Sequence, residues 1–337
     1  MSLKEMTDLM LPAIEAELRK QVTRIDESHT KTLHDMLAYH LGWSGDGSGK
    51  EARGKRIRPL LVLLTSAACG ADWKIALPAA AAVELVHNFS LVHDDIQDNS
   101  SKRRGRDTVW VKWGIPQGIN AGDSLFVLSN LAILDLVSGL PPEMVVAAAK
   151  ILHDTCLDLT RGQFLDMSYE ERNDLTVEDY WLMVSYKTAA LLASCCALGA
   201  IISRVDVSTQ ESYRDFGHYL GLAFQVQDDY LGIWGKWLQT GKSAEADLIS
   251  KKKSLPVLFG LGKKGQFAQR WDKGPIDPED VVWLADQLTS EGGRLYTQET
   301  ADQMTDMALA ALRTAEPKGD AGDALFELAN KLLMRAA

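Results

Sequence analysis

Apolar residues recur along most of this chain at the spacing of a helix face. Leu9, Ile14 and Leu18 begin one stripe, and a second stripe runs from Ile57 to Ala68 at intervals of three and four residues. Further helices are expected in six segments: 76–93, 125–138, 144–160, 188–202, 207–234 and 298–335. No alternating valine–polar segment is bounded by Asn-Gly or Asp-Gly, the combination typical of β-hairpins. The pattern predicts an all-α protein.

Glycine and proline interrupt this pattern in three short segments: 45–49, 139–142 and 264–278. Each segment is expected to be a loop between helices, because none has the length or composition of a domain linker. No internal repeat is visible. We therefore expect one all-helical domain over residues 1–337, with roughly ten or more helices of ordinary length.

Composition and charge exclude several classes of function. The chain has 337 residues, 46% hydrophobic and 24% charged, with a formal net charge of −10. A nucleic-acid partner or an anionic membrane surface would favour a basic face, so neither is expected. The four cysteines show no CxxC spacing, which argues against a zinc site or a disulfide scaffold and favours a cytoplasmic protein.

Neither a membrane span nor a signal peptide is expected. The apolar run from Ala189 to Ser203 is shorter than the ~20 residues that cross a bilayer, so it predicts a buried helix. Charges interrupt the apolar residues among the first twenty positions.

The sequence HDDIQD places three carboxylates at the end of an apolar helical run. Asp94 and Asp98 are four residues apart, so they share a helix face with Asp95 at its edge. Such carboxylates repel one another unless hard cations lie between them, and Mg²⁺ prefers oxygen ligands that it shares with phosphate. Arginines 103, 104 and 106 follow immediately and suit phosphate recognition.

A second acidic pair, Asp228 and Asp229, ends the helical run at 224–231. Two aspartates in an apolar helix are costly unless cations compensate them. Gly232 stands where a third carboxylate would complete a copy of the first motif. The two acidic helix ends are expected to face each other across a helical bundle.

These motifs resemble the trans-isoprenyl diphosphate synthases, or polyprenyl synthetases, across nearly the whole chain. The resemblance rests on GKRIRP at 54–59, ELVHNFSLVHDDIQD at 84–98, RRGRDTVW at 103–110, GQFLDM at 162–167, YKTA at 186–189, FQVQDD at 224–229 and GKSAEADLISKKKSLP at 241–256. It implies the all-α isoprenoid synthase fold, with helices around a central cavity, usually in a homodimer. Lys251 stands where the family commonly has glycine.

The resemblance implies a role for each matching residue. Mg²⁺, three ions in all, is expected at Asp94, Asp95, Asp98, Asp228 and Asp229. The allylic diphosphate is expected at Arg103, Lys187, Lys242 and Lys252, and isopentenyl diphosphate at Lys55, Arg58, His87 and Arg104. Thr188 and Gln225 are expected to face the developing carbocation.

The implied reaction is head-to-tail transfer of an allylic group to isopentenyl diphosphate. Phe89, five residues before Asp94, lies ~7.5 Å deeper along a helix axis and is expected to limit the product to C20, geranylgeranyl diphosphate. A C15 (farnesyl) or longer-chain synthase stays open, as do a terpene cyclase of the same fold and a non-catalytic partner subunit.

Overall fold

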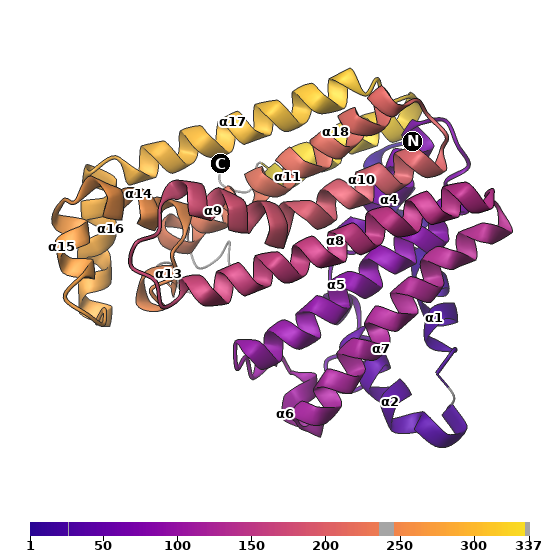
Figure 1. The fold of residues 1–337 in the computed structure, drawn as a ribbon, viewed down its shortest axis with the longest axis horizontal. Coiled ribbons are helices and arrows are strands. Elements are labelled where there is room, and N and C mark those ends of the chain that lie inside the picture. Colours follow the sequence, from indigo (N-terminus) through magenta and orange to yellow (C-terminus); the bar gives the residue numbers. More distant parts are fainter. Residues whose placement is uncertain (26, 236–245, 334–337) are drawn as a thin grey trace. The chain divides into compact units, whose positions relative to one another are not determined.

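The fold is almost entirely helical, as the computed structural model in Figure 1 shows. The structure describes residues 1–25, 27–235 and 246–333. The helices are α1 (Leu3–Val22), α2 (Glu27–His40), α3 (Lys50–Arg53), α4 (Ile57–Ala68), η1 (Trp73–Ala76), α5 (Leu77–Gln97), α6 (Val109–Trp113), α7 (Ile115–Leu134), η2 (Asp135–Ser138), α8 (Pro142–Tyr169), α9 (Val177–Val184), η3 (Ser185–Ala189), α10 (Ala190–Ile202), α11 (Val207–Trp234), α13 (Ala246–Ile249), α14 (Leu255–Lys263), α15 (Gln266–Trp271), η4 (Pro278–Asp280), α16 (Val281–Ser290), α17 (Gly293–Thr314) and α18 (Gly319–Leu333). The predicted all-α class is confirmed.

Three local features differ from the pattern-based expectation. Two short strands, β1 (Lys102–Arg103) and β2 (Arg106–Asp107), form an antiparallel hairpin that the absence of valine alternation did not predict. The expected loop at 264–278 contains α15, because Phe267 and Trp271 bury their rings in a local core. The expected helix at 298–335 is divided into α17 and α18 at Glu316, whose φ of 49° ends the first of them.

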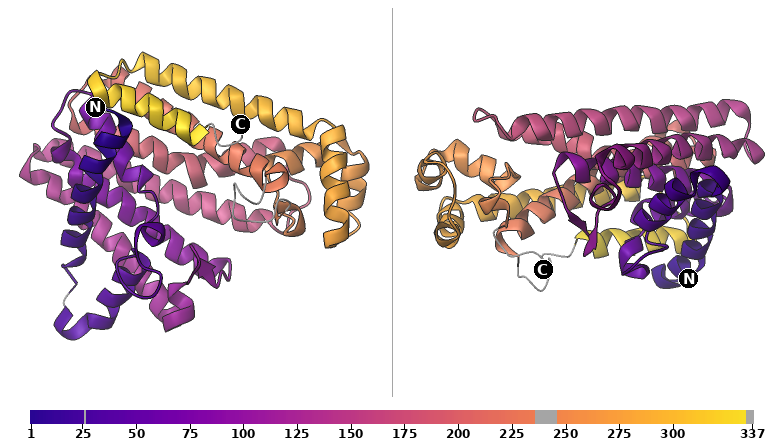
Figure 2. Two further views of the ribbon diagram at one scale, coloured as in Figure 1. Left: turned by 180° about the vertical axis from the view of Figure 1, so that it is seen from behind. Right: turned by 90° about the horizontal axis from the view of Figure 1, so that it is seen from below.

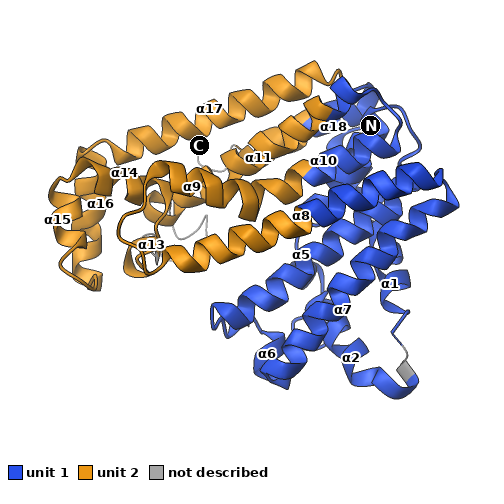
Figure 3. Cartoon of the chain, in the orientation of Figure 1, with its two compact units in different colours: residues 1–154, 194–210, 317–325 blue, residues 155–193, 211–316, 326–337 orange. Residues whose placement is uncertain are grey.

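The chain forms two compact units that the polypeptide enters more than once (Figure 3). Unit 1 contains residues 1–154, 194–210 and 317–325, and unit 2 contains residues 155–193, 211–316 and 326–337. Since neither unit is one continuous segment, a simple division of the sequence does not separate them. The single domain over residues 1–337 stays a prediction.

In unit 1, α5 packs along α7 and against α4 and α1. Four consecutive alanines, 79–82, are fully buried in α5 and let its neighbours approach closely. Gly122 serves the same purpose on α7, because a Cβ there would lie 2.2 Å from the Nε2 atom of His93. The close packing fixes the end of α5 that carries the first acidic motif.

Unit 2 has two local cores. One surrounds Tyr180, Val226 and Leu255, and joins α9, α11 and α14. The other surrounds Phe267 and Leu284. Helices α14, α15 and α16 gather at one end of α17 (Figures 1 and 2). The first core packs against the part of α11 that carries the second acidic motif.

Within the described residues, three helical stretches are long and apolar enough to cross a membrane: Trp73–Gln97, Ile115–Ser138 and Val177–Ile202. The last of them is longer than the apolar run that the sequence argument used, because α9, η3 and α10 are continuous. The protein buries 61% and 67% of the most apolar window in the first and third stretches, but 44% in the second. The first and third are therefore mostly interior, whereas α7 keeps an exposed apolar face.

Candidate functional site

The first acidic motif lies at the C-terminal end of α5 in unit 1. Asp98 is the C-cap of the helix, and its backbone N–H donates to the carbonyl of Asp94 at 2.8 Å. Asp98 is exposed and Asp94 is partly exposed, whereas Asp95 is buried. The Nε of Arg103 donates to Asp95 Oδ1 at 2.9 Å. Burial raises the pKa of Asp95, and the charge of Arg103 opposes that rise.

The hairpin that follows presents the arginines. Arg104 and Gly105 occupy its turn with φ of 53° and 75°, the pair of left-handed conformations that a type I′ turn requires. The Arg104 guanidinium lies against the chain before α4: its Nη1 donates to the Ala52 carbonyl at 2.8 Å, and a Cβ on Gly54 would come within 2.7 Å of its Cζ. The turn therefore brings Arg104 beside the GKRIRP segment.

Arg58, His87 and Arg104 form a cluster on unit 1, here called the cationic cluster. Arg58 Nη1 lies 3.3 Å from His87 Nε2. Burial, together with the charges of Arg58 and Arg104, holds the pKa of His87 well below its ordinary value, so the imidazole is neutral. Burial also lowers the pKa of Arg58 and of Arg104. Lys55, three residues before Arg58 in the sequence, is exposed.

Phe89 packs between two rings of unit 1. Its centroid lies 5.0 Å from that of Phe126 on α7 and 4.9 Å from that of His93. Phe89 and Phe126 are both partly buried. A second aromatic residue therefore accompanies the one that the sequence indicated.

In unit 2, Lys187 and Thr188 lie in η3, a π-helical turn. Such turns widen the helix locally and occur often at functional sites. Lys187 Nζ is hydrogen-bonded to Asp166 Oδ2 of α8. Gly162 makes this approach possible, since a Cβ there would lie 2.3 Å from the backbone nitrogen of Lys187. Thr188 Oγ1 donates to Gln225 Oε1 at 3.0 Å.

Asp229 is fully buried and accepts four hydrogen bonds. Its Oδ1 accepts from Gln225 Nε2 at 3.0 Å and from Lys252 Nζ at 3.3 Å. Its Oδ2 accepts from Tyr180 Oη at 2.7 Å and from the Leu255 N–H at 3.2 Å. The Asp229 carboxylate raises the pKa of Lys252, and desolvation opposes that rise. Asp229 therefore fixes Lys252 and Gln225 in place.

Asp228, the neighbouring residue, is exposed. Gly232, one turn later, faces Asp247: a Cβ at position 232 would lie 2.3 Å from Asp247 Oδ2. Asp247 in turn lies 3.7 Å from Lys252 Nζ. The space next to Gly232 is thus filled by a carboxylate from another segment. Lys242 lies outside the described residues.

In residues 1–25, 27–235 and 246–333, no group of three or more His, Cys, Asp or Glu side chains is arranged to hold a metal ion. Asp94 and Asp98 nonetheless fit Mg²⁺, because they are two oxygen donors one helical turn apart and reachable from solvent. Mg²⁺ commonly uses one or two carboxylates and completes its octahedron with water and phosphate oxygens.

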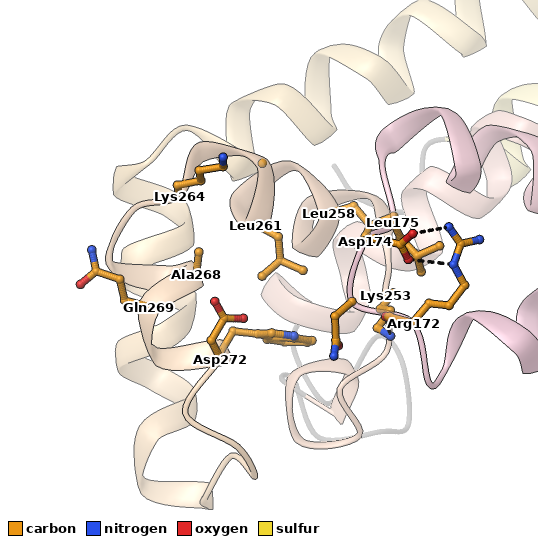
Figure 4. A pocket seen from close by; sticks show the side chains of 13 residues that line it. Arg172, Asp174, Leu175, Lys253, Leu258, Leu261, Lys264, Ala268, Gln269 and Asp272 are labelled. Carbon is orange, nitrogen blue, oxygen red and sulfur yellow. Dashed lines mark hydrogen bonds and ion pairs between the residues drawn. The ribbon is translucent and has the colours of Figure 1, made fainter.

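A cavity of about 620 Å³ lies in unit 2, between residues 172–175 and helices α14 and α15 (Figure 4). Its lining includes the ion pair of Arg172 with Asp174, and Lys253, whose Nζ donates to the carbonyls of Tyr169 and Glu170. None of the candidate metal or substrate residues that the structure describes lines this cavity.

The structure brings together most of the candidate residues within each unit. Unit 1 joins Arg58, His87 and Arg104, and pairs Asp95 with Arg103; unit 2 joins Thr188, Gln225, Asp229 and Lys252. Sequence reasoning missed the partners of these residues, namely Asp166, Tyr180 and Asp247. Asp166 and Asp247 stand inside matched motifs, whereas nothing in the local sequence singles out Tyr180.

An all-α protein with cationic clusters and carboxylates at helix ends has the groups that an enzyme acting on diphosphates needs. The family model that matches the chain is that of the polyprenyl synthetases, over residues 49–284. The chain therefore belongs to the polyprenyl synthetase family.

Similar proteins are known from bacteria. The chain is 39% identical over 314 residues to a geranylgeranyl diphosphate synthase of Mycobacterium tuberculosis, covering 91% of this chain and 89% of that protein. It is 38% identical over 295 residues to a (2E,6E)-farnesyl diphosphate synthase of the same species, covering 84% and 80%. A solved polyprenyl synthetase from Streptomyces coelicolor superposes with a TM-score of 0.87 at 34% identity, covering 99% of this chain and 100% of that chain.

These findings confirm three predictions made from the sequence: the family, its all-α fold and the class of enzyme, a prenyltransferase. The family is generally dependent on Mg²⁺. The roles of individual residues stay predictions.

Proposed function

We propose that this protein condenses an allylic diphosphate with isopentenyl diphosphate to an all-trans short-chain product, geranylgeranyl diphosphate (C20). The observation that carries the proposal is the cationic cluster of unit 1. In the described part of the chain, Arg58 and Arg104 hydrogen-bond a neutral histidine and a backbone carbonyl instead of a carboxylate. Guanidinium groups whose partners are neutral favour a bound anion, and a diphosphate suits their forked donors.

The cluster is assigned to isopentenyl diphosphate. Arg58, His87 and Arg104 would contact its oxygens, with Lys55 at the exposed edge. His87, being neutral, would donate from one ring nitrogen without adding charge. This assignment requires no metal, because the cluster itself is positive.

The metal ions are assigned to both acidic motifs, with three Mg²⁺ ions in total. Asp94 and Asp98 would hold Mg²⁺ at the end of α5, while Asp95 orients Arg103. In unit 2 the exposed Asp228 would be the ligand. The family resemblance implies that Asp229 is also a Mg²⁺ ligand. Its four hydrogen bonds instead favour a role in positioning Gln225 and Lys252.

The allylic diphosphate is assigned to Arg103, Lys187, Lys252 and Lys242. When bound, Mg²⁺ neutralises charge on this group and makes it a better leaving group. The cationic side chains donate hydrogen bonds to its oxygens as the allylic C–O bond breaks. The oxygens of Thr188 and Gln225 then face the allylic cation.

The second half of the reaction forms one bond and removes one proton. The isopentenyl double bond attacks the cation to make the new C–C bond, helped by the fixed position of both reactants. The released diphosphate takes the proton that is lost next to the new bond. No described side chain is needed as a dedicated base.

Chain length is assigned to Phe89, which precedes the first motif, and to Phe126 of α7. Phe89 precedes Asp94 by more than one turn and is backed by Phe126, so the two rings would stop the growing chain. A farnesyl (C15) or longer-chain product is the alternative, and the relatives carry both C15 and C20 names.

A homodimer is proposed from the exposed face of α7. Ile119, Val127, Leu131 and Leu134 are 43%, 55%, 36% and 52% exposed and follow one helical stripe. Exposed apolar side chains on one helix face mark an interaction surface, and we assign this one, which Asp123 interrupts between Ile119 and Val127, to a second copy of the chain. Val127→Asp should shift the sedimentation equilibrium of the protein toward monomer, whereas Val282→Asp, at a similarly exposed valine of α16, should not. An unchanged mass for Val127→Asp would remove α7 from the interface.

A cytoplasmic location is also proposed, since all four cysteines are free thiols. Neither nucleic acid nor a membrane is assigned as a partner.

The test is an assay of the purified full chain with Mg²⁺, isopentenyl diphosphate and each allylic starter, followed by sizing of the products. Elongated C20 diphosphates support the proposal. Cyclised hydrocarbons would select a terpene cyclase, and no turnover with any starter would select a non-catalytic subunit. Arg58→Gln should raise the KM for isopentenyl diphosphate more than that for the allylic substrate.

A further inference from the structure

Arg56 occupies an unusual backbone conformation between two candidate substrate residues, Lys55 and Arg58. It is the N-cap of α4, with φ of 50° and ψ of 39°, and only 5% of the residue is exposed. The left-handed region is strained for a residue other than glycine. Such a conformation persists where surrounding contacts hold it.

Three donors of the Arg56 side chain supply those contacts. Nε donates to Glu15 Oε1 at 2.8 Å, Nη1 donates to Glu84 Oε1 at 2.7 Å and Nη2 donates to the Leu41 carbonyl at 3.1 Å. Burial opposes the charge of Arg56, but Glu84 and Glu15 outweigh it and raise the pKa of the guanidinium. Arg56 therefore has its own counter-ions, unlike its neighbour Arg58.

The carboxylates of Glu15 and Glu84 each accept a hydrogen bond from one further side chain. The indole Nε1 of Trp43 donates to Glu15 Oε2 at 2.7 Å. The side-chain amide of Asn88 donates to Glu84 Oε1 at 2.9 Å. The network thus joins α1, the segment after α2, the start of α4 and the middle of α5.

The Arg56 network and the cationic cluster both connect the start of α4 with α5. Glu84 precedes His87 by one turn of α5, and Arg56 precedes Arg58 by two residues at the start of α4. The Arg56–Glu84 ion pair and the Arg58–His87 contact are therefore two successive links between the same two helices. The first link sets the separation at which the second can form.

We propose that Arg56 is a positioning residue for the second diphosphate site: its buried bonds to Glu84 and Glu15 hold the left-handed turn that directs Arg58 toward His87. The inference rests on the proposed function, since it concerns binding of isopentenyl diphosphate. It predicts a specific defect in the use of that substrate when the ion pair is weakened.

The experiment compares Arg56→Lys, Glu84→Gln and Arg56→Gly in the full-length protein. Lysine keeps the charge but cannot bond both carboxylates, and glycine relieves the backbone strain while removing the ion pair. Initial rates are measured against isopentenyl diphosphate and against the allylic substrate, at a temperature well below each thermal midpoint. Arg24→Lys, which weakens the ion pair of Arg24 with Asp135 elsewhere in unit 1, is the control.

We expect Arg56→Lys and Glu84→Gln to raise the KM for isopentenyl diphosphate on the order of tenfold, with kcat and the allylic KM within about twofold of the original protein. Arg56→Gly should show a smaller rise, because glycine adopts the left-handed conformation without strain but does not replace the links to Glu84 and Glu15. A fall in thermal midpoint with both KM values unchanged, or an equal rise in both, would overturn the inference and leave Arg56 as a stabilising residue. If the unmodified protein itself makes no prenyl product, the proposed function fails first, which separates the two results.

Discussion

Replacement of Asp229 by asparagine separates two roles for this carboxylate, metal ligand and positioning group. The change keeps the size of the side chain but leaves one acceptor oxygen in place of two. That oxygen can face the Gln225 and Lys252 donors or the Tyr180 and Leu255 donors, but not both pairs. Two of the four donors therefore lose their acceptor.

The expected loss of stability follows from those two contacts. A hydrogen bond to a charged group contributes about 1.5–3 kcal/mol, so two of them amount to about 3–6 kcal/mol. The Lys252 side chain is 41% exposed and regains contact with water, which lowers the cost. We expect Asp229→Asn to lose about 3 kcal/mol of folding free energy, seen as a fall of roughly 4 °C in thermal midpoint.

The matched variant is Asp228→Asn at the exposed neighbouring position. A surface substitution of this kind should change the folding free energy by no more than about 0.5 kcal/mol. As the assigned metal ligand, it should instead raise the half-saturating Mg²⁺ concentration on the order of tenfold or more. The assay is a Mg²⁺ titration of prenyl transfer, with thermal unfolding of the same samples.

The reasoning predicts opposite profiles for the two variants. Asp229→Asn should lose kcat and stability with little change in its Mg²⁺ requirement, because the position of Lys252 is disturbed. If Asp229→Asn keeps its thermal midpoint and needs as much extra Mg²⁺ as Asp228→Asn, then Asp229 is a metal ligand and the positioning role is wrong.

Three further predictions concern other parts of the site. Gly232→Asp should give no gain in activity and a lower thermal midpoint, since its side chain would collide with Asp247 and oppose its charge; a large gain in activity would mean that the missing carboxylate had limited catalysis. Phe126→Ala and Phe89→Ala should each lengthen the products resolved by chromatography, and unchanged products would remove that ring as a floor. Desolvation lowers the pKa of His40 to about 3, so the unfolded chain binds its proton first and stability should fall as pH drops below ~6.5, by up to ~1.4 kcal/mol per pH unit. His40→Gln should reduce this slope in unfolding measurements, and an unchanged slope would assign it to other groups.

The helices could be predicted because their signal is periodic and local. The stripe from Ile57 to Ala68 gave the bounds of α4, and segment 207–234 gave those of α11. The short hairpin at 102–107 was not predicted, because its strands contain no valine alternation. Its turn depends on Arg104 in a left-handed conformation that glycine would adopt more easily. Lys251 is a similar case, with φ of 53° at a position where the family commonly has glycine.

Local patterns identified the charged residues of the site, but not their partners. Arg103 and Lys187 were predicted as diphosphate ligands without Asp95 or Asp166 as their hydrogen-bond acceptors. Such pairs depend on the packing of helices and turns that are distant in the sequence, which a period of three or four residues does not encode. The π-helical turn around Lys187 is likewise set by the close contact with Gly162.

The partners divide the cationic residues into two groups that match the two proposed substrates. Arg103, Lys187 and Lys252, assigned to the allylic diphosphate, each hydrogen-bond a carboxylate. Arg58 and Arg104, assigned to isopentenyl diphosphate, contact neutral groups. A diphosphate bound by any residue of the first group would meet an aspartate as well as a cation, so extra positive charge would have to accompany it, and bound Mg²⁺ would supply that charge. The second group can bind a diphosphate directly. On this reasoning we expect removal of Mg²⁺ to weaken the binding of the allylic substrate more than that of isopentenyl diphosphate.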